Sequence, residues 1–266
     1  MIDSKIQEEL RAKYNPDGSD LRKAQLRMLD MLKYIDNVCN EQKIPYWLDS
    51  GTLLGAARHG GFIPWDDDAD IGMLRKDAIR FKNYVLTHPN PNYIIQCRET
   101  DPGFWGNWFV LRDLYSEYVL DDKVHNIRKY RGLQVDIFNF DKNVVYFLSK
   151  ISVRFARKRK KLIKAQSFKK IRVFDFFLNN IVFPFFRLLS IIFSSNKYMS
   201  HSYGSFFEKR RPIDTIYPLV KINFEGFSFS APRDYEAYLR SLYGENCMEL
   251  PSSNHRVAHK VKIIFY

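Results

Sequence analysis

Four aspartates crowd into the segment WDDDAD, at Asp66, Asp67, Asp68 and Asp70. The rest of the chain is basic, because 42 Lys and Arg stand against 30 Asp and Glu and give a formal net charge of +12. Carboxylates this close repel one another, so a fold that holds them together also needs something that neutralises them. That requirement limits the fold more strongly than any other feature of the sequence.

A chain of 266 residues can bury a sizeable core, and we expect one domain with an insertion. Its apolar share of 45% and aromatic share of 16% exclude disordered and collagen-like proteins. Cys39, Cys97 and Cys247 lie far apart and lack the spacing of a disulfide framework or a zinc site. The first twenty residues lack the apolar core of a signal peptide, so we expect a cytoplasmic protein.

Hydrophobic spacing predicts alternating helices and strands in the first half of the chain. Helical patterns cover 20–44 and 77–88, and strand patterns cover 69–74, 92–97, 108–114 and 132–140. A short strand or turn at 46–48 and a Gly51-Thr52 turn lead into a short helix ended by Gly60-Gly61. A strand pair about Glu225-Gly226 and a helix over 232–243 follow near the end. The order predicts an α+β fold.

The middle of the chain changes character. Residues 150–172 hold eleven Lys or Arg and no Asp or Glu, and the apolar, aromatic segment 173–193 follows. Polar residues and a proline interrupt that segment, whereas a spanning helix needs roughly 20 largely uncharged residues, so none is predicted. We expect a helix pair at an anionic membrane surface, against the alternative that the basic run is a solvated helix face.

The aspartate spacing indicates a metal site. Asp68 and Asp70 point the same way on a strand, and Asp136, on a neighbouring strand, adds a third carboxylate. Mg²⁺ prefers oxygen ligands, uses one or two protein carboxylates, and takes its remaining ligands from water and substrate phosphate. We therefore predict a divalent cation, Mg²⁺ or Mn²⁺, at Asp68, Asp70 and Asp136, against the alternative of a solvated acidic turn.

A phosphate site is expected upstream. Gly51 and Thr52 stand before a helix whose free N–H groups and dipole favour phosphate, and Arg58 and His59 offer further contacts. A phosphate-holding turn, then Asp-x-Asp and a later Asp, is the layout of nucleotidyltransferase-fold enzymes. The alternatives are a simple helix cap for Gly51 and Thr52, a surface arginine and a structural histidine.

Aromatic residues suggest a further role. Trp65, Trp105 and Trp108 are candidates for a cage around a quaternary ammonium group, with core packing as the alternative. Arg112 either holds phosphate or pairs with Asp113.

The quoted segments resemble one known family. GTLLGAARHGGFIPWDDDADIGM is similar to the signature of the LicD/fukutin family of phosphotransferases, GLQVDIFNFD resembles its later Asp-Ile-Phe element, and YEAYLRSLYGENCMELP resembles its C-terminal element. The later element usually continues with proline, where this chain has Asn139. The resemblance covers roughly 20–141 and 215–260, which we take as a catalytic core at 20–141 and a family element within 201–266, separated by the insertion at 142–200.

The resemblance implies a nucleotidyltransferase-like mixed sheet flanked by helices, with Asp68, Asp70 and Asp136 as metal ligands and Gly51 and Thr52 at the donor phosphate. It also implies an enzyme that moves a substituted phosphate, such as phosphocholine, from a CDP-linked donor to a cell-surface glycan or glycolipid. Two alternatives stay open: a nucleotidyltransferase that uses an NTP and releases pyrophosphate, and a non-enzymatic basic protein that binds nucleic acid or membrane. We expect no specific nucleic acid.

Overall fold

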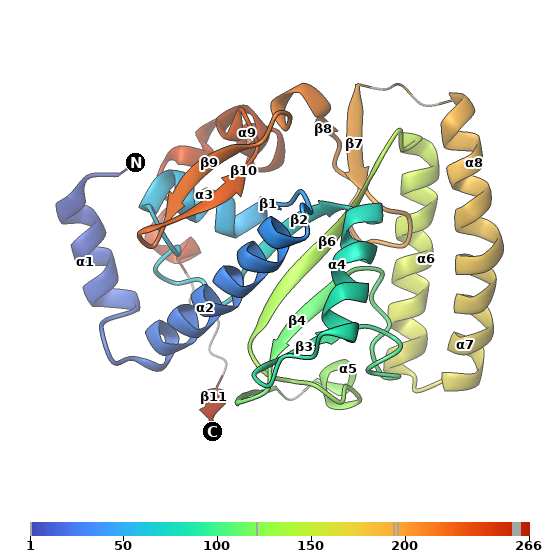
Figure 1. The fold of residues 1–266 in the computed structure, drawn as a ribbon, viewed down its shortest axis with the longest axis horizontal. Coiled ribbons are helices and arrows are strands. Elements are labelled where there is room, and N and C mark those ends of the chain that lie inside the picture. The colour runs from blue at the N-terminus through green and yellow to red at the C-terminus, as the bar shows by residue number, and fades with distance from the viewer. Residues whose placement is uncertain (1, 121, 194, 196, 257–261) are drawn as a thin grey trace.

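The structure is a computed structural model that describes residues 2–120, 122–193, 195, 197–256 and 262–266 (Figure 1). Its centre is a mixed sheet in the order β1-β2-β6-β4-β3, with β7 on β6 and β8 on β7. The strands are β1 (Trp47–Leu48), β2 (Asp70–Leu74), β3 (Tyr93–Gln96), β4 (Phe109–Asp113), β6 (Gln134–Lys142), β7 (Tyr198–His201) and β8 (Arg211–Pro212). Helices flank this sheet, which confirms the α+β prediction.

Strand β6 is the longest and organises the sheet. It runs parallel to β2, while β4 and β7 pair antiparallel with its first and last parts. Its alternating side chains divide as the sequence predicts, because Val135 and Ile137 are fully buried whereas Gln134 and Asp136 are partly exposed. Asp136 therefore lies on the strand face that is open to a site.

The helices α2 (Asp20–Glu41) and α4 (Arg75–Thr87) cross in front of the sheet in Figure 1. The inner face of α2 is the apolar stripe expected from its spacing, with Met28, Met31 and Ile35 fully buried. The remaining N-terminal helices are α1 (Ser4–Tyr14) and α3 (Ser50–His59). Gly60 ends α3 in a left-handed conformation, as the Gly60-Gly61 pair predicts.

The C-terminal part folds back on this core. The hairpin β9 (Val220–Phe224) and β10 (Phe227–Ala231) turns at Glu225-Gly226 as expected, and α9 (Tyr235–Tyr243) packs on α3. Four strands escaped the sequence prediction: β7, β8, β5 (Ser116–Val119) and β11 (Lys262–Phe265), the last two forming a separate pair. The short elements are the helix α5 (Lys123–Asn126) and four single turns, η1 (Leu178–Val182), η2 (Ile213–Thr215), η3 (Glu245–Met248) and η4 (Ser253–His255).

The basic-aromatic segment forms a helical layer beside the sheet. Helix α6 (Tyr146–Lys164) is followed by α7 (Phe168–Phe177), the π-helical turn η1 and α8 (Phe183–Phe193), which join into one long rod. Figure 1 shows this rod as the outermost element, with α6 between it and the sheet. A small second core holds the layer together, with Leu178, Phe183 and Tyr203 at its centre.

Candidate active site

Two of the predicted carboxylates stand side by side. The register of the parallel strands pairs Asp70 of β2 directly with Asp136 of β6. The backbone N–H of Asp136 also donates to Ala69 O at 2.8 Å, which fixes the start of the pairing. Asp68 lies two residues before β2, outside the strand proper. The sequence prediction that a neighbouring strand brings Asp136 to this motif is confirmed.

Burial and mutual repulsion disfavour the ionised carboxylates of the cluster. Burial, together with the Asp68 and Asp136 carboxylates, raises the pKa of Asp70 well above its ordinary value. Burial raises the pKa of Asp136 to about 6, with Arg112 opposing and Asp68 reinforcing the change. Burial and the Asp68 and Asp67 carboxylates raise the pKa of Asp66 in the same way. These groups share a weakly solvated site in which each disfavours the ionisation of the others.

The loop that carries the acidic motif is firmly held. Gln25 of α2 donates through Nε2 to Ile63 O at 3.3 Å and to Asp66 O at 2.9 Å. From the other side, the Tyr118 hydroxyl donates to Asp67 O at 2.8 Å. Buried backbone carbonyls are satisfied in both cases, so the aspartates are presented by a fixed backbone.

Gly51 and Thr52 lie in the first turn of α3, and not in a turn before it as the sequence suggested. Asp49 caps the helix, since its Oδ1 accepts from Ser50 N at 2.8 Å. The helix therefore begins at Ser50, before the Gly51-Thr52 pair that the sequence placed in a turn. Thr52 is buried, and its Oγ1 accepts from Asp70 N at 2.8 Å. A Cβ at position 51 would stand 2.9 Å from Asp66 Oδ2, so glycine lets the Asp66 carboxylate approach the helix.

A second buried network, which the sequence analysis missed, stands behind this turn. The Tyr238 hydroxyl of α9 donates to Asp49 Oδ1 at 2.6 Å and accepts from Trp47 Nε1 at 3.3 Å. The Arg211 guanidinium lies 3.9 Å from Asp49 Oδ2. In the sequence, the only indication of this network was the resemblance of the C-terminal segment to the family element. Tyr238 of that segment holds Asp49, the N-cap of α3, and Thr52 of the same helix holds the backbone of Asp70.

Arg58 and His59 lie at the opposite end of α3. Arg58 Nη1 donates to the carbonyls of Cys247 (3.1 Å) and Glu249 (2.9 Å), and its Nε donates to His59 Nε2 at 2.9 Å. Both side chains are buried, and burial lowers the pKa of His59 to about 3. Arg58 follows Gly51 by seven helical residues, which is about 10 Å along the axis, so it does not share the N-terminal turn. The hydrogen bonds of Arg58 join it to the C-terminal segment.

The three tryptophans do not form one cage. Trp65 packs edge-on against Tyr14 and His59, with ring centroids at 5.3 and 5.9 Å. Trp105 and Trp108 line a common cavity of about 500 Å³, and Trp65 is not among its walls. Trp108 has a direct role at the cluster, because its Nε1 donates to Asp136 Oδ1 at 3.1 Å. Gln134 Nε2 reaches the other oxygen of Asp136 at 3.3 Å.

A cavity of about 290 Å³ adjoins the acidic cluster, with Asp67 and Asp68 as well as Arg112 and Arg128 in its wall. Arg112 does not pair with Asp113. Its Nε donates to Gln96 Oε1 and its Nη1 to Gly132 O, each at 2.8 Å, while its buried Nη2 has no protein partner. Burial lowers the pKa of Arg112 to about 10, so the group stays charged at neutral pH. An unpaired guanidinium donor beside a cavity is suited to an anionic ligand.

An aromatic cavity of about 380 Å³ lies at the N-terminal turn of α3, between Ser50, Phe138, Phe207 and Tyr243. Phe138 follows Asp136 on the same face of β6. Among the residues that the structure describes, no group of three or more His, Cys, Asp and Glu side chains is arranged to hold a metal ion by itself.

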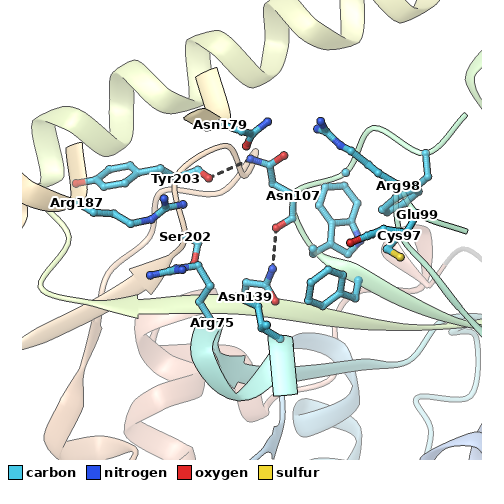
Figure 2. A pocket seen from close by; sticks show the side chains of 15 residues that line it. Arg75, Cys97, Arg98, Glu99, Asn107, Asn139, Asn179, Arg187, Ser202 and Tyr203 are labelled. Atoms are coloured by element: carbon cyan, nitrogen blue, oxygen red, sulfur yellow. Dashed lines mark hydrogen bonds between the residues drawn. The ribbon is translucent and has the colours of Figure 1, made fainter. Parts of the chain in front are cut away.

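A further pocket of about 360 Å³ lies between the sheet and the rod (Figure 2). Asn139 of β6, Asn107 and Ser202 meet there with Arg75 and Arg187, whose guanidinium groups both approach Asp141. Asn139 Nδ2 donates to Asn107 O at 2.9 Å, while Asn139 Oδ1 and Ser202 Oγ, both buried, have no protein partner. The walls of this pocket mix polar and apolar side chains, and it shares Trp108 with the cavity of about 500 Å³.

Comparisons with known proteins identify relatives of this chain. The chain is 27% identical to the lipopolysaccharide cholinephosphotransferase LicD of Haemophilus influenzae over 264 residues, which cover 91% of this chain and 96% of that protein. It is 48% identical to the human ribitol 5-phosphate transferase FKRP over 46 residues, or 17% of this chain and 9% of that protein. The family model described as "LicD/FKTN/FKRP, nucleotidyltransferase domain" matches residues 43–176, which hold the acidic motif, Trp108 and Asp136. The chain belongs to the LicD/FKTN/FKRP family of nucleotidyltransferase domains.

Proposed function

We propose that the protein transfers a substituted phosphate from a CDP-linked donor to a hydroxyl of a cell-surface glycan or glycolipid. The observation that carries the proposal is the pairing of Asp70 with Asp136 beside a cavity that contains Asp68 and the unpaired guanidinium donor of Arg112. Carboxylates next to free cationic donors suit a phosphoryl group delivered with its metal. The names of the two relatives, a cholinephosphotransferase and a ribitol 5-phosphate transferase, describe the same class of transfer.

The carboxylates suit Mg²⁺ or Mn²⁺, and Asp68, Asp70 and Asp136 would hold it. Burial and neighbouring carboxylates raise the pKa of Asp70 and of Asp136, and a cation bound there would favour their ionised forms. Magnesium needs one or two protein carboxylates and completes its shell with water and phosphate, so a complete protein cage is not required. When bound, the ion supplies charge neutralisation for the diphosphate.

The reaction we propose is an in-line displacement. The acceptor oxygen forms a bond to the phosphorus that carries the transferred group, the bond from that phosphorus to the bridging oxygen breaks, and CMP leaves. Asp136 takes the proton of the acceptor hydroxyl as the general base. Trp108 and Gln134 orient that carboxylate.

Arg112 and Arg128 hold donor phosphate in this proposal. Gly51 and Thr52 act at the donor site through the carboxylates, since Gly51 admits Asp66 and Thr52 fixes the backbone of Asp70. The aromatic cavity between Phe138 and Tyr243 is then the candidate place for the transferred group. Trp105 and Trp108 stay candidates for a contact with that group from the neighbouring cavity.

The test is product identification. Purified protein with Mg²⁺ is offered CDP-choline, CDP-ethanolamine, CDP-ribitol, CDP-glycerol and CTP, with and without host glycolipid, and CMP and pyrophosphate are followed by mass spectrometry. Acceptor-stimulated CMP from one CDP compound is expected. It is expected to disappear in Asp68→Asn and in a metal-free reaction, and to persist in Asp20→Asn, a matched change at a largely exposed carboxylate. Pyrophosphate from CTP would overturn the proposal in favour of a nucleotidyltransferase.

We also propose that the protein works in the cytoplasm at the inner face of the cell membrane, where lipid-linked glycans are within its reach. The support is the helical layer beside the sheet, whose outer surface is apolar and whose neighbouring surface is basic.

A further inference from the structure

The rod of residues 168–193 has two distinct faces. Its buried positions follow steps of four, three, five, three and four residues, at Ile171, Asp175, Leu178, Phe183, Phe186 and Ser190. The single five-residue step coincides with the π-helical turn at Leu178–Val182. A π turn inserts one residue into a helix, so the inward face continues in line from α7 into α8 and the outward face does the same.

The outward face is apolar along its whole length. Nine large apolar side chains on it are between 49% and 77% exposed: Val173, Phe176, Phe177, Ile181, Phe185, Leu188, Ile191, Ile192 and Phe193. A surface helix of a soluble domain turns such a stripe toward the core. A contiguous exposed stripe of this kind marks a surface that is covered by a partner.

Three polar residues within 173–193 turn the other way. Asp175 is buried and pairs with Arg159 of α6 and with Arg98. Asn179 and Arg187 line the pocket beside the sheet, and Figure 2 shows both reaching into it. Of the residues that interrupt the apolar segment, these three therefore face the protein, while Asn180 and Pro184 are exposed.

Basic side chains are also exposed on both helices of this layer. They are Lys150, Arg154, Arg157, Lys158, Lys160, Lys161 and Lys164 on α6, and Lys169, Lys170 and Arg172 on α7. No Asp or Glu lies between residues 150 and 172. Long basic side chains next to apolar surface place their charges at lipid headgroups while the apolar groups enter the acyl region. This complementarity favours an anionic bilayer over a protein partner.

The flanking strands fix the orientation of the rod. By length and composition it is long and apolar enough to cross a membrane, with 26 residues. However, β6 before the helical layer and β7 after it pair in one sheet, through Phe140 with His201 and Lys142 with Met199. A crossing rod would put these strands on opposite sides of the bilayer. We infer that the rod docks flat on an anionic membrane, with its outward face in the interface and the sheet above it.

Vesicle flotation with the full chain tests the docking. The protein is expected to float with vesicles that contain phosphatidylglycerol, to float less with phosphatidylcholine alone, and to lose part of its binding at high salt. Leu188→Gln with Ile192→Gln is expected to lower the partition coefficient about a hundredfold, because each buried apolar side chain contributes about tenfold. Ile6→Gln with Leu26→Gln, at apolar positions of similar chemistry on α1 and α2, is the matched control and is expected to bind normally.

Single labels test the flat orientation. The native cysteines are buried, so a spin label attaches selectively to Phe177→Cys, Phe185→Cys or Ile192→Cys. Equal immersion depths at the three positions are expected for a rod in the membrane plane, and a steady change of depth along the rod would overturn the orientation. Absence of vesicle binding at low salt would overturn the docking, as would a stable dimer that the Leu188→Gln, Ile192→Gln pair converts to monomers. Docking needs no transferase activity, so this proposal and the proposed function fail separately.

Discussion

The strain within the acidic cluster leads to an unusual prediction for Asp136→Asn. Substitution of a buried residue commonly lowers the free energy of unfolding. This substitution is instead expected to stabilise the metal-free protein while removing activity. The reason is that the ionised Asp136 carboxylate is disfavoured by burial and by Asp68, and the amide carries no charge. The side chain keeps its shape, and its oxygen still accepts from Trp108 Nε1.

The magnitude follows from the pKa. A rise from 3.8 to about 6 makes ionisation at neutral pH cost the folded state about 3 kcal/mol. Partial exposure of Asp136 reduces this to about 2 kcal/mol, and loss of the Gln134 hydrogen bond offsets about 1 kcal/mol. We therefore expect a net gain of about 1 kcal/mol at pH 7.5, or about 2 to 4 °C in Tm for a chain of this size.

The pH dependence gives the sharper assay. Between pH 3.8 and about 6 the folded protein holds a proton on Asp136 that the unfolded chain has released, so this carboxyl makes stability fall as pH rises through that window. Denaturant unfolding in EDTA from pH 5 to 8 is expected to show a shallower fall in Asp136→Asn than in the parent. Added Mg²⁺ is expected to stabilise the parent most at high pH. A variant destabilised by more than about 1 kcal/mol, or one with the parent's pH slope, would refute the reasoning.

Four further substitutions test other parts of the site and the insertion. Gly51→Ala places a methyl group 2.9 Å from Asp66 Oδ2, so transfer is expected to fall by about tenfold with a stability loss of about 1 kcal/mol, read from kcat and denaturant unfolding. Trp108→Phe removes a hydrogen bond that opposes the burial-driven rise in the pKa of Asp136, so the acidic limb of the pH-rate profile is expected to move to higher pH. Arg58→Ala frees two buried carbonyls and is expected to cost about 2 kcal/mol while leaving the donor KM unchanged; a raised KM would instead restore Arg58 to the phosphate site. Arg159→Met breaks the buried pair with Asp175 and is expected to cost about 3 kcal/mol, part of which Asp175→Leu should recover in the double variant.

Local patterns in the sequence predicted the acidic centre well. The alternating pattern in 132–140 placed Asp136 on the strand face opposite Val135 and Ile137. The Asp-x-Asp spacing placed Asp68 and Asp70 on one face of their own strand. Both inferences rest on the two-residue period of a strand, which does not depend on the rest of the fold. The direct pairing of Asp70 with Asp136 follows from the parallel register of β2 and β6, which sequence spacing alone does not specify.

The contacts of Arg58, Arg112 and Asp49 lay beyond sequence reasoning. Arg58 follows a phosphate-like motif in the chain, but the helix carries it about 10 Å from the turn where the motif begins, and its hydrogen bonds go to the C-terminal segment. The partners of Arg112 lie on other segments, at Gln96 and Gly132. Asp49 gains its importance from Tyr238, 189 positions away in the chain. Long-range contacts decide each of these roles, and a single sequence contains no direct record of them.

Strand β6 links the proposed chemistry to the proposed membrane surface. Asp136 and Asp141 are five residues apart on it, which is about 17 Å of strand. Asp141 lies at the inner side of the rod, 3.8 Å from Arg187, and a helix is about 10 Å thick. The carboxylates therefore stand at most about 31 Å from the apolar outer face, with the pocket of Figure 2 between the rod and the sheet. A glycan tethered to lipid spans this gap with its first sugars, so a glycolipid with a short glycan should be a better acceptor on vesicles than the same glycan free in solution.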